Sequence, residues 1–279
     1  MKILAFTLLC LSLPIQSQAK DTIIWVTENF EPYYIPFGEL ANKGIGDRLN
    51  RALINELPEF DHVFQYMPIL RITSAIKNGE HIAVNAYLRN PKDTKFALYS
   101  ITSLVVPPLE LTMRMSDWKN QWQQAERISL VALLKKNYMI GIAGRRYYGD
   151  NLSPILYDTK TYPNSTYVVQ STHYRSLADL VARRRIDATI GYAAELKYYQ
   201  RYAAEPEKLV TVPIIENPDV LYAYVVMPKN DWGSALKIKI DAALHRIRNT
   251  EKYRSIMYDW FGRNASLEKA IDERLSSNY

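Results

Sequence analysis

The chain has 279 residues, of which 48% are hydrophobic and 23% are charged, with a formal net charge of +6. This length accommodates one large or two ordinary domains, and the composition excludes wholesale disorder. Lys135-Lys136 and Arg183-Arg184-Arg185 are tight basic clusters, and neither is interleaved with aromatic residues, so nucleic-acid binding is not expected.

The N-terminal segment has the pattern of an export signal. Lys2 precedes an apolar run over 3–13, and small residues at Ser17 and Ala19 match a peptidase site. We expect cleavage after Ala19, a periplasmic location and no membrane span in the mature chain. If the chain were a lipoprotein, Cys10 would be the lipidated residue, but the preceding Leu9 stands where a small residue is normally required. The mature chain would then have no cysteine and no disulfide, as suits a bacterial periplasmic protein with a large core.

The first half of the mature chain alternates buried-strand runs with amphipathic helical stretches. Prolines and glycines mark the connections between them, since the residue before a proline is pushed out of helical geometry. In chain order, we expect a strand over 22–26, an extended loop over 31–36, a helix over 44–57, a strand over 64–67, a helix over 69–76, and strands over 82–87 and 109–113.

The second half repeats this alternation. The pair Pro107-Pro108 suits a connection, after which the strand over 109–113 leaves the first group of elements. The polar tail after Gly262 is expected to be frayed or loosely docked. In chain order, we expect a helix over 130–136, strands over 139–144 and 166–169, a helix over 177–181, strands over 186–192 and 222–227, and a long amphipathic helix over 235–260.

A short unit occurs twice, over 79–87 and 184–192. Each copy follows a helical stretch and consists of a polar turn, a buried strand and a tyrosine. Two copies indicate two similar α/β lobes with a cleft between them, each with a mainly parallel sheet flanked by helices. Two crossover hinge strands, near Thr112 and Tyr224, would join the lobes. The expected division is a signal over 1–19, lobe one over 20–112 and 222–262, lobe two over 113–221, and the tail over 263–279.

Six short segments, taken in chain order, resemble those of one known family. They are Pro32-Tyr33, Gly44-Ile45-Gly46-Asp47, Lys77-Asn78-Gly79, Tyr99-Ser100, Arg185-Ile186-Asp187-Ala188 and the end Asp259-Trp260-Phe261-Gly262. On these segments the chain resembles the bacterial extracellular solute-binding proteins of family 3, the periplasmic binding proteins best known for amino-acid uptake. The resemblance covers almost all of the mature chain and implies a two-lobed periplasmic binding protein fold that closes around a ligand.

Two positions depart from that family. Its members usually carry an arginine after the first repeated strand, which clamps the ligand carboxylate, and here Asp93 stands in that place. An aspartate that receives the ligand ammonium often follows the second repeated strand, and here that place is Tyr192. The resemblance therefore implies a divergent branch, with a standard amino acid held in the standard way in doubt.

Several residues are candidates for ligand binding at the cleft. Tyr87 and Tyr192 end the two repeated units and would touch a ligand from opposite lobes, or else pack as half-buried rings. Arg89 follows the first strand, where a guanidinium would hold a carboxylate bidentately, or else it is a solvated surface residue. Tyr33, in the first strand-loop with Glu28 and Phe30, would line the floor of the cleft.

The segment Gly144-Arg145-Arg146-Tyr147 follows the first strand of the second lobe. A glycine turn before a helix start presents backbone N–H groups to an anion, and two arginines would strengthen that; the alternative is a surface loop. With Arg89, these residues predict a small anionic or polar ligand.

Three functions are compatible with such a cleft. The first is a monomeric solute-binding protein that serves a membrane permease, the ABC importer. The second is a periplasmic sensor that signals to a membrane protein. The third is an enzyme on the same scaffold, of dehydratase type. The four histidines are scattered without metal spacing, and no GxSxG segment is present, so we expect no catalytic residue, metal or cofactor.

Overall fold

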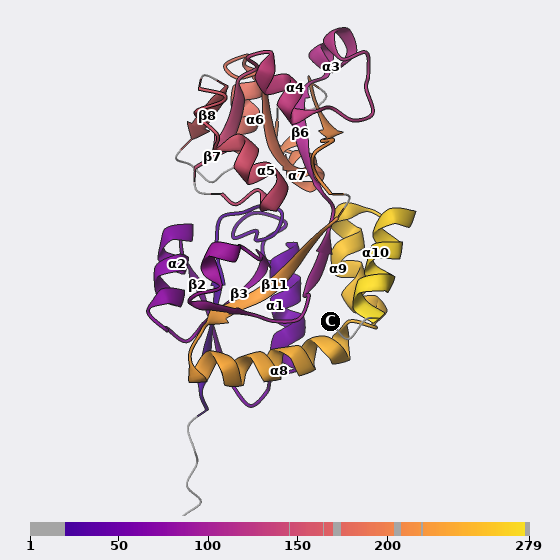
Figure 1. Cartoon of the computed structure of the whole chain (residues 1–279). Helices are drawn as coiled ribbons and strands as arrows, with labels where there is room; N and C mark the ends of the chain where they lie inside the picture. The colour runs from indigo at the N-terminus through magenta and orange to yellow at the C-terminus, as the bar shows by residue number, and fades with distance from the viewer. Residues whose placement is uncertain are drawn as a thin grey trace, which may run out of the picture.

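The computed structural model describes residues 20–144, 146–163, 165–169, 174–203, 208–218 and 220–276, so the expected export signal over 1–19 lies outside the described residues. Figure 1 shows two α/β lobes, one above the other, joined at a narrow waist. The expected two-lobed α/β fold is confirmed. Among the described residues, no helix is both long and apolar enough to cross a membrane.

The first lobe contains the N-terminal elements and the C-terminal helices. They are β1 (Thr22–Thr27), α1 (Ile45–Asn55), β2 (Asp61–Tyr66), α2 (Ile69–Lys77), β3 (Ile82–Leu88), the short 3-10 turn η1 (Pro91–Asp93), β4 (Ala97–Tyr99), β5 (Leu104–Val106), β11 (Leu221–Pro228), α8 (Asp231–Ile247), α9 (Glu251–Phe261) and α10 (Ala265–Ser276).

The second lobe contains the elements between β5 and β11. They are β6 (Leu109–Arg114), α3 (Met115–Gln121), α4 (Leu130–Lys135), β7 (Ile140–Ala143), α5 (Gly149–Leu156), β8 (Thr166–Val169), α6 (Tyr174–Ala182), β9 (Ala188–Tyr192), α7 (Ala193–Gln200) and β10 (Leu209–Pro213).

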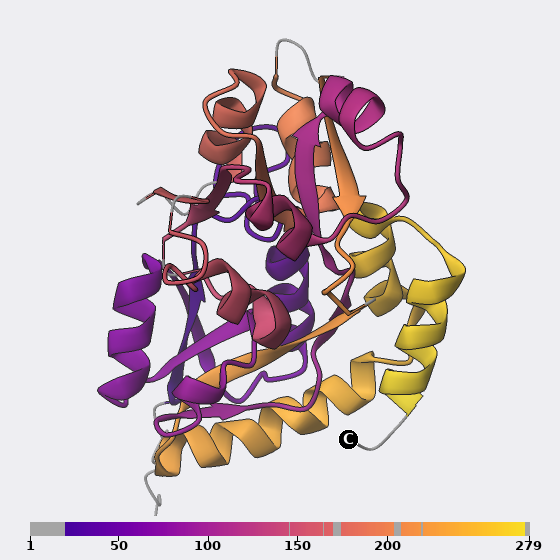
Figure 2. The same cartoon turned by 45° about the horizontal axis from the view of Figure 1, so that its top comes forward.

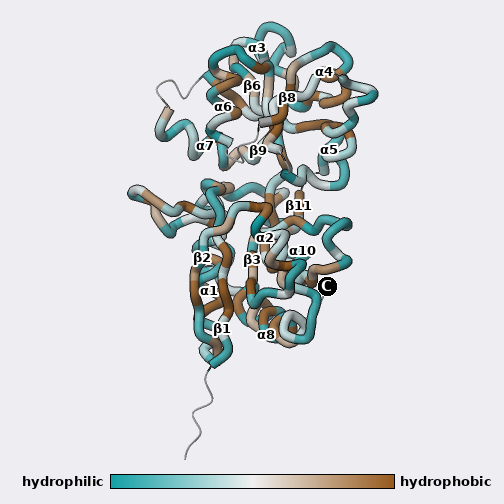
Figure 3. The backbone as a smooth tube through the Cα atoms, turned by 90° about the vertical axis from the view of Figure 1, so that its left-hand side faces the viewer, coloured by the Kyte–Doolittle hydropathy of each residue, from teal (hydrophilic) through white to brown (hydrophobic). Residues whose placement is uncertain are grey.

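Both sheets are mixed rather than mainly parallel. The first has the order β2-β1-β3-β11-β4, with β5 also paired to β11, and the second has the order β10-β6-β9-β7-β8. Strands β1, β2 and β3 are parallel, as are β7, β8 and β9, whereas β11 and β6 run against their neighbours. The reason is that β6 and β11 each enter a lobe from the waist, while the parallel strands run towards it. Figure 3 shows hydrophobic segments along the strands of both lobes.

The two repeated units occupy equivalent places. Strand β3 lies between the parallel β1 and the antiparallel β11, and β9 lies between the parallel β7 and the antiparallel β6. The turn before each strand contains one residue with left-handed backbone, Gly79 in the first copy and Arg184 in the second. The same sequence unit therefore builds the same structural unit in both lobes.

The first change of lobe lies earlier than the boundary expected after residue 112. Strand β6 already pairs with β9 at its first residue, where Leu109 faces Tyr192. We therefore propose that Pro107-Pro108 marks the first crossing and that the segment before Leu221 marks the second.

The glycines of the segment Gly44-Ile45-Gly46-Asp47 fit the start of α1 against the preceding loop. A Cβ on Gly44 would lie 2.4 Å from the carbonyl oxygen of Tyr33, and one on Gly46 would lie 2.6 Å from the Tyr34 ring. A carboxylate oxygen of Asp47 accepts hydrogen bonds from the backbone N–H groups of Ile35 and Gly44, at 3.0 and 3.1 Å. This packing fixes the loop that carries Tyr33 and Tyr34.

The C-terminal region differs from the expectation in two ways. The helix expected over 235–260 is two helices, because Thr250 caps α9 by accepting a hydrogen bond from the backbone N–H of Tyr253 at 3.2 Å. The tail expected to be frayed or loosely docked instead forms α10, whose Leu267 and Ile271 are buried in the main core. Figure 2 shows α8 along the first lobe, with α9 and α10 beside each other.

The packing of α10 leads to a stability prediction. Ile271→Ala should lower the free energy of unfolding by about 2–4 kcal/mol, because the side chain is fully buried and its removal leaves a cavity. Lys269→Ala, on the exposed face of the same helix, should change it by less than about 0.5 kcal/mol. Urea unfolding measures both variants, and equal stabilities would show that α10 is not part of the cooperative core.

Candidate functional site

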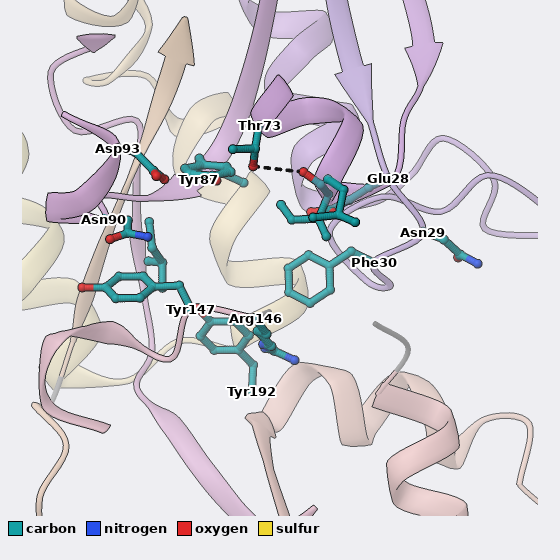
Figure 4. A pocket seen from close by; sticks show the side chains of 14 residues that line it. Glu28, Asn29, Phe30, Thr73, Tyr87, Asn90, Asp93, Arg146, Tyr147 and Tyr192 are labelled. Carbon is teal, nitrogen blue, oxygen red and sulfur yellow. Dashed lines mark hydrogen bonds between the residues drawn. The ribbon is translucent and has the colours of Figure 1, made fainter. Parts of the chain in front are cut away.

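A cavity of about 200 Å³ lies between the two lobes. The first lobe contributes Glu28, Phe30, Thr73, Tyr87 and Asp93, and the second contributes Arg146, Tyr147 and Tyr192. Figure 4 shows the rings of Phe30, Tyr87, Tyr147 and Tyr192 around it. The cavity is therefore bounded by both lobes, and each lobe contributes aromatic side chains to its wall.

The cavity is located where parallel strands of both sheets end. Glu28 directly follows β1, Tyr87 lies near the end of β3, Arg146 follows β7, and Tyr192 ends β9. Ligands of α/β sheets bind at the carboxyl ends of the strands. The expectation that Tyr87 and Tyr192 meet at a cleft from opposite lobes agrees with this placement.

A bulge in β3 shapes the first-lobe wall. Two residues of β3, Asn85 and Ala86, lie opposite the single Val225 of β11, and Ala86 has a φ of 54°. Bulges of this kind re-aim side chains and recur beside functional sites. The buried Asn85 amide donates a hydrogen bond to the carbonyl of Gly46 at 3.0 Å, and the Tyr34 hydroxyl donates to the Asn85 carbonyl at 3.0 Å. These hydrogen bonds hold the bulge next to the cavity.

Arg146 forms a two-point ion pair with Glu195 in the second lobe. Its two terminal nitrogens donate to the two carboxylate oxygens at 3.0 and 2.8 Å, and the Glu195 side chain is fully buried. Burial by itself lowers the pKa of Arg146, but the Glu195 carboxylate raises it above its ordinary value, so the guanidinium stays charged. One Glu195 oxygen also accepts the backbone N–H of Tyr192 at 2.8 Å, at the start of α7.

Aromatic rings make contacts between the lobes beside this ion pair. The Tyr33 ring lies 5.3 Å from that of Tyr192 and stacks on Phe30 at 4.8 Å, between centroids. The Arg146 guanidinium lies 5.0 Å from the Phe30 ring centroid. Such contacts are worth about 0.5–1.5 kcal/mol each, so they favour apposition of the lobes without locking it.

Glu28 is a partly buried carboxyl group at the cavity. Burial raises its pKa from 4.5 to about 7, although the charge of Arg146 acts in the opposite direction. Among the described residues, the Glu28 carboxylate has no hydrogen-bond or ion-pair partner. The group is therefore close to its protonation midpoint at neutral pH and faces the cavity.

Asp93 is the second carboxyl group of the cavity. It lies in η1, and its charge and that of Glu28 both raise the pKa of Tyr87 beyond the effect of burial. In the view of Figure 4, Glu28 and Asp93 lie on opposite sides of the Tyr87 ring. Burial also raises the pKa of Asp93, while the nearby Lys77 lowers it.

The structure brings together some of the residues predicted from the sequence and separates others. Tyr87, Arg146 and Tyr192 line the cavity. Tyr33 is buried behind Tyr192, and Gly144 is not among the lining residues although it precedes them in the chain. Arg145 lies outside the described residues.

Arg89 does not line this cavity. Its guanidinium lies 4.6 Å from the Tyr224 ring and 5.2 Å from the Tyr99 ring, at a neighbouring cavity next to β11. The reason is that β3 ends at Leu88, so the alternation of side chains does not continue to Arg89. Of the arginines expected to face one ligand, Arg146 therefore lines this cavity and Arg89 does not.

Several residues of the site were not predicted, among them Thr73, Asp93 and Glu195. Thr73 lies in α2, and no sequence motif around it indicates a binding residue. Asp93 was noted only because it stands where the family usually carries an arginine. That departure was the sequence feature that could have marked it as a site residue. Glu195 occupies the first turn of α7, where acidic residues are common, so only the fold reveals it as the partner of Arg146.

Known structures share this architecture at low sequence identity. The arginine-, lysine- and histidine-binding protein ArtJ of Geobacillus stearothermophilus is 18% identical with a TM-score of 0.67, over 90% of this chain and 99% of that one. A periplasmic binding protein of Salmonella typhimurium with high arginine specificity is 15% identical with a TM-score of 0.64, over 87% of this chain and all of that one.

A histidine kinase sensor domain with similarity to periplasmic binding proteins is 14% identical with a TM-score of 0.66, over 88% of this chain and 97% of that one. No protein-family model and no curated protein matches the sequence. At these identities the likeness shows the fold alone. The chain has the two-lobed fold of the periplasmic binding proteins, as the sequence resemblance implied.

The environment of Glu28 leads to a prediction about pH. Between about pH 4.5 and 7 the native carboxyl keeps its proton while the unfolded one loses it, so this group lowers stability as the pH rises. The free energy of unfolding of Glu28→Gln should therefore equal that of the parent protein near pH 4.5 and exceed it above pH 7, by at most about 3 kcal/mol. Urea unfolding across this range measures the difference, with the exposed Glu39→Gln as control. Parallel curves for parent and Glu28→Gln would contradict the raised pKa.

Proposed function

We propose that this chain is a periplasmic solute-binding protein that encloses a small organic molecule between its lobes and presents it to an ABC importer. The observation that carries this proposal is the cavity at the strand ends of both lobes, lined by the tyrosines of the two repeated units. The three proteins named above that share its fold support it, since two are binding proteins and the third is a sensor domain. The absence of catalytic activity stays a prediction.

The proposed mechanism is closure of the two lobes. Strands β6 and β11 are the proposed hinges, because each begins at the waist and belongs to a different sheet from the element before it. A ligand that touches Tyr87 in one lobe and Tyr147 in the other stabilises the closed form only through contacts that the open form lacks. The closed surface is then what a membrane partner recognises.

The proposed location is the periplasm, with the protein acting as a monomer. The export pattern of residues 1–19 supports the location. A sensor that signals to a membrane protein would use the same closing cavity, and uptake assays separate the two. Loss of the chain should abolish import of the ligand, whereas a pure sensor would leave import intact.

The site predicts that both lobes contribute to affinity. In a thermal-shift screen of amines, amino acids, carboxylic acids and sugars, a ligand at one hundred times its dissociation constant should add about 2.7 kcal/mol of stability. Tyr87→Ala and Tyr147→Ala should each weaken binding of such a ligand about tenfold or more, because each removes an aromatic wall from a different lobe.

Tyr167→Ala is the matched control, since Tyr167 is 49% exposed on β8. Its affinity should equal that of the parent. If the affinity of a ligand depended on only one of the two cavity tyrosines, that ligand would not bridge the lobes. A screen in which no compound stabilises the protein would count against solute binding.

A further inference from the structure

We propose that the molecule held in this cavity is a small organic cation that carries a protonated amine and no carboxylate. This inference rests on the proposed function, because it names the ligand class of the same site. It departs from the small anionic or polar ligand expected from the sequence, since Arg146 is paired with Glu195 and Arg89 lies at the neighbouring cavity, while Arg145 lies outside the described residues.

The charges of the cavity wall are the first argument. Among the described lining residues, the ionisable carboxyl groups are Glu28 and Asp93, and the guanidinium is that of Arg146. Both outer nitrogens of Arg146 already bind Glu195, whose side chain is fully buried, so this positive charge is balanced within the second lobe. Among the described lining residues, the two carboxyl groups are therefore the charged groups without an ion-pair partner.

Glu28 has the environment of a carboxylate that lacks its counter-ion. The group is partly buried, and Arg146 acts on it only at a distance while paired with Glu195. A protonated amine next to Glu28 would restore its ionised form through a charge-assisted hydrogen bond. An anion at the same place would meet the like charge of the Glu28 carboxylate, which is unfavourable.

Asp93 supports the same conclusion from the other side of Tyr87. Lys77 is the cation that acts on Asp93, but its ammonium group lies 4.8 Å from the Phe96 ring centroid, and Lys77 is not among the lining residues. Asp93 therefore adds negative potential to the cavity without a lining cation to balance it. Arg89 is not a lining cation either, because its guanidinium lies over the Tyr224 ring at the neighbouring cavity.

The aromatic lining is the second, independent argument. Phe30, Tyr87, Tyr147 and Tyr192 present rings to the cavity from both lobes (Figure 4). The face of an aromatic ring attracts cations and repels anions. Rings together with two carboxyl groups form a cage suited to an ammonium group with an apolar or aromatic body.

A metal ion is the alternative cation. Among the described residues, no group of three or more histidine, cysteine, aspartate or glutamate side chains is arranged to hold one. Two carboxyl groups on opposite sides of a ring suit separate N–H donors better than a single compact ion, which requires converging ligands.

The test compares probes that differ only in charge. Phenethylamine and 3-phenylpropionate share a ring and a two-carbon chain but end in an ammonium and a carboxylate group respectively. L-Phenylalanine carries both groups, and 1,4-diaminobutane carries two amines without a ring. Isothermal titration against the full mature chain at pH 8 should show binding of at least one amine, at least tenfold tighter than the carboxylate and the amino acid.

The variants locate the amine. Glu28→Gln and Asp93→Asn should each weaken the bound amine at least tenfold, because each removes one charged acceptor. The exposed Glu39→Gln and Asp259→Asn change the net charge equally and should leave the affinity unchanged. An amine affinity that is insensitive to both cavity variants would overturn the inference.

The remaining outcomes separate this inference from the proposed function. If 3-phenylpropionate or L-phenylalanine binds more tightly than the amines and Tyr147→Ala abolishes that binding, the cation inference is wrong and solute binding stands. If neither these probes nor any compound of the wider screen binds, the proposed function itself fails.

Discussion

The ion pair between Arg146 and Glu195 is the contact on which the cavity depends. It links the segment after β7 to the first turn of α7, and Glu195 also accepts the N–H of Tyr192, so one carboxylate positions residues of two second-lobe walls. The guanidinium lies 5.0 and 5.5 Å from the rings of Phe30 and Tyr192, which extends the contact to the first lobe. Removing one partner of such a buried pair costs about 3–5 kcal/mol, because the other charge is left without compensation. The same pairing removes Arg146 as a free anion receptor, and this determines the electrostatics of the site.

The first-lobe wall depends on a different kind of constraint. The bulge at Asn85 and Ala86 places a left-handed residue next to the cavity, a conformation that is unfavourable for residues other than glycine. It persists because buried hydrogen bonds of Asn85 with Tyr34 and with the Gly46 carbonyl hold the strand from behind. The loop after β1 is held in turn by Asp47 at the start of α1. Buried polar networks of this kind define a unique local geometry when they are satisfied, so Glu28, Phe30 and Tyr87 are presented from a rigid support.

Much of the fold was predictable, since the repeated unit reflects a local pattern of helix, turn and buried strand. Tyr87 and Tyr192 were found for the same reason, because strand ends meet at the cleft. Arg89 was misplaced because the strand ends just before it, and the role of Arg146 was missed because Glu195 is close only in the folded chain. The break at Thr250 and helix α10 had sequence signals, a capping threonine and the spacing of Leu267, Ala270 and Ile271. The antiparallel direction of β6 and β11 could not be inferred from strand order alone, because it follows from how the chain crosses the waist.

The central claim, that a ligand in this cavity holds the two lobes together, is tested most directly by a distance between them. The only cysteine of the sequence is Cys10, within the expected signal, so spin labels can be attached to the mature chain at Lys92→Cys in the first lobe and Lys160→Cys in the second, both exposed positions. Pulsed electron paramagnetic resonance should show a broad distribution of label-to-label distances for the free protein. With a saturating concentration of an amine that binds, the distribution should be narrower and centred at a shorter distance. A distribution that the bound amine leaves unchanged would contradict the closure account.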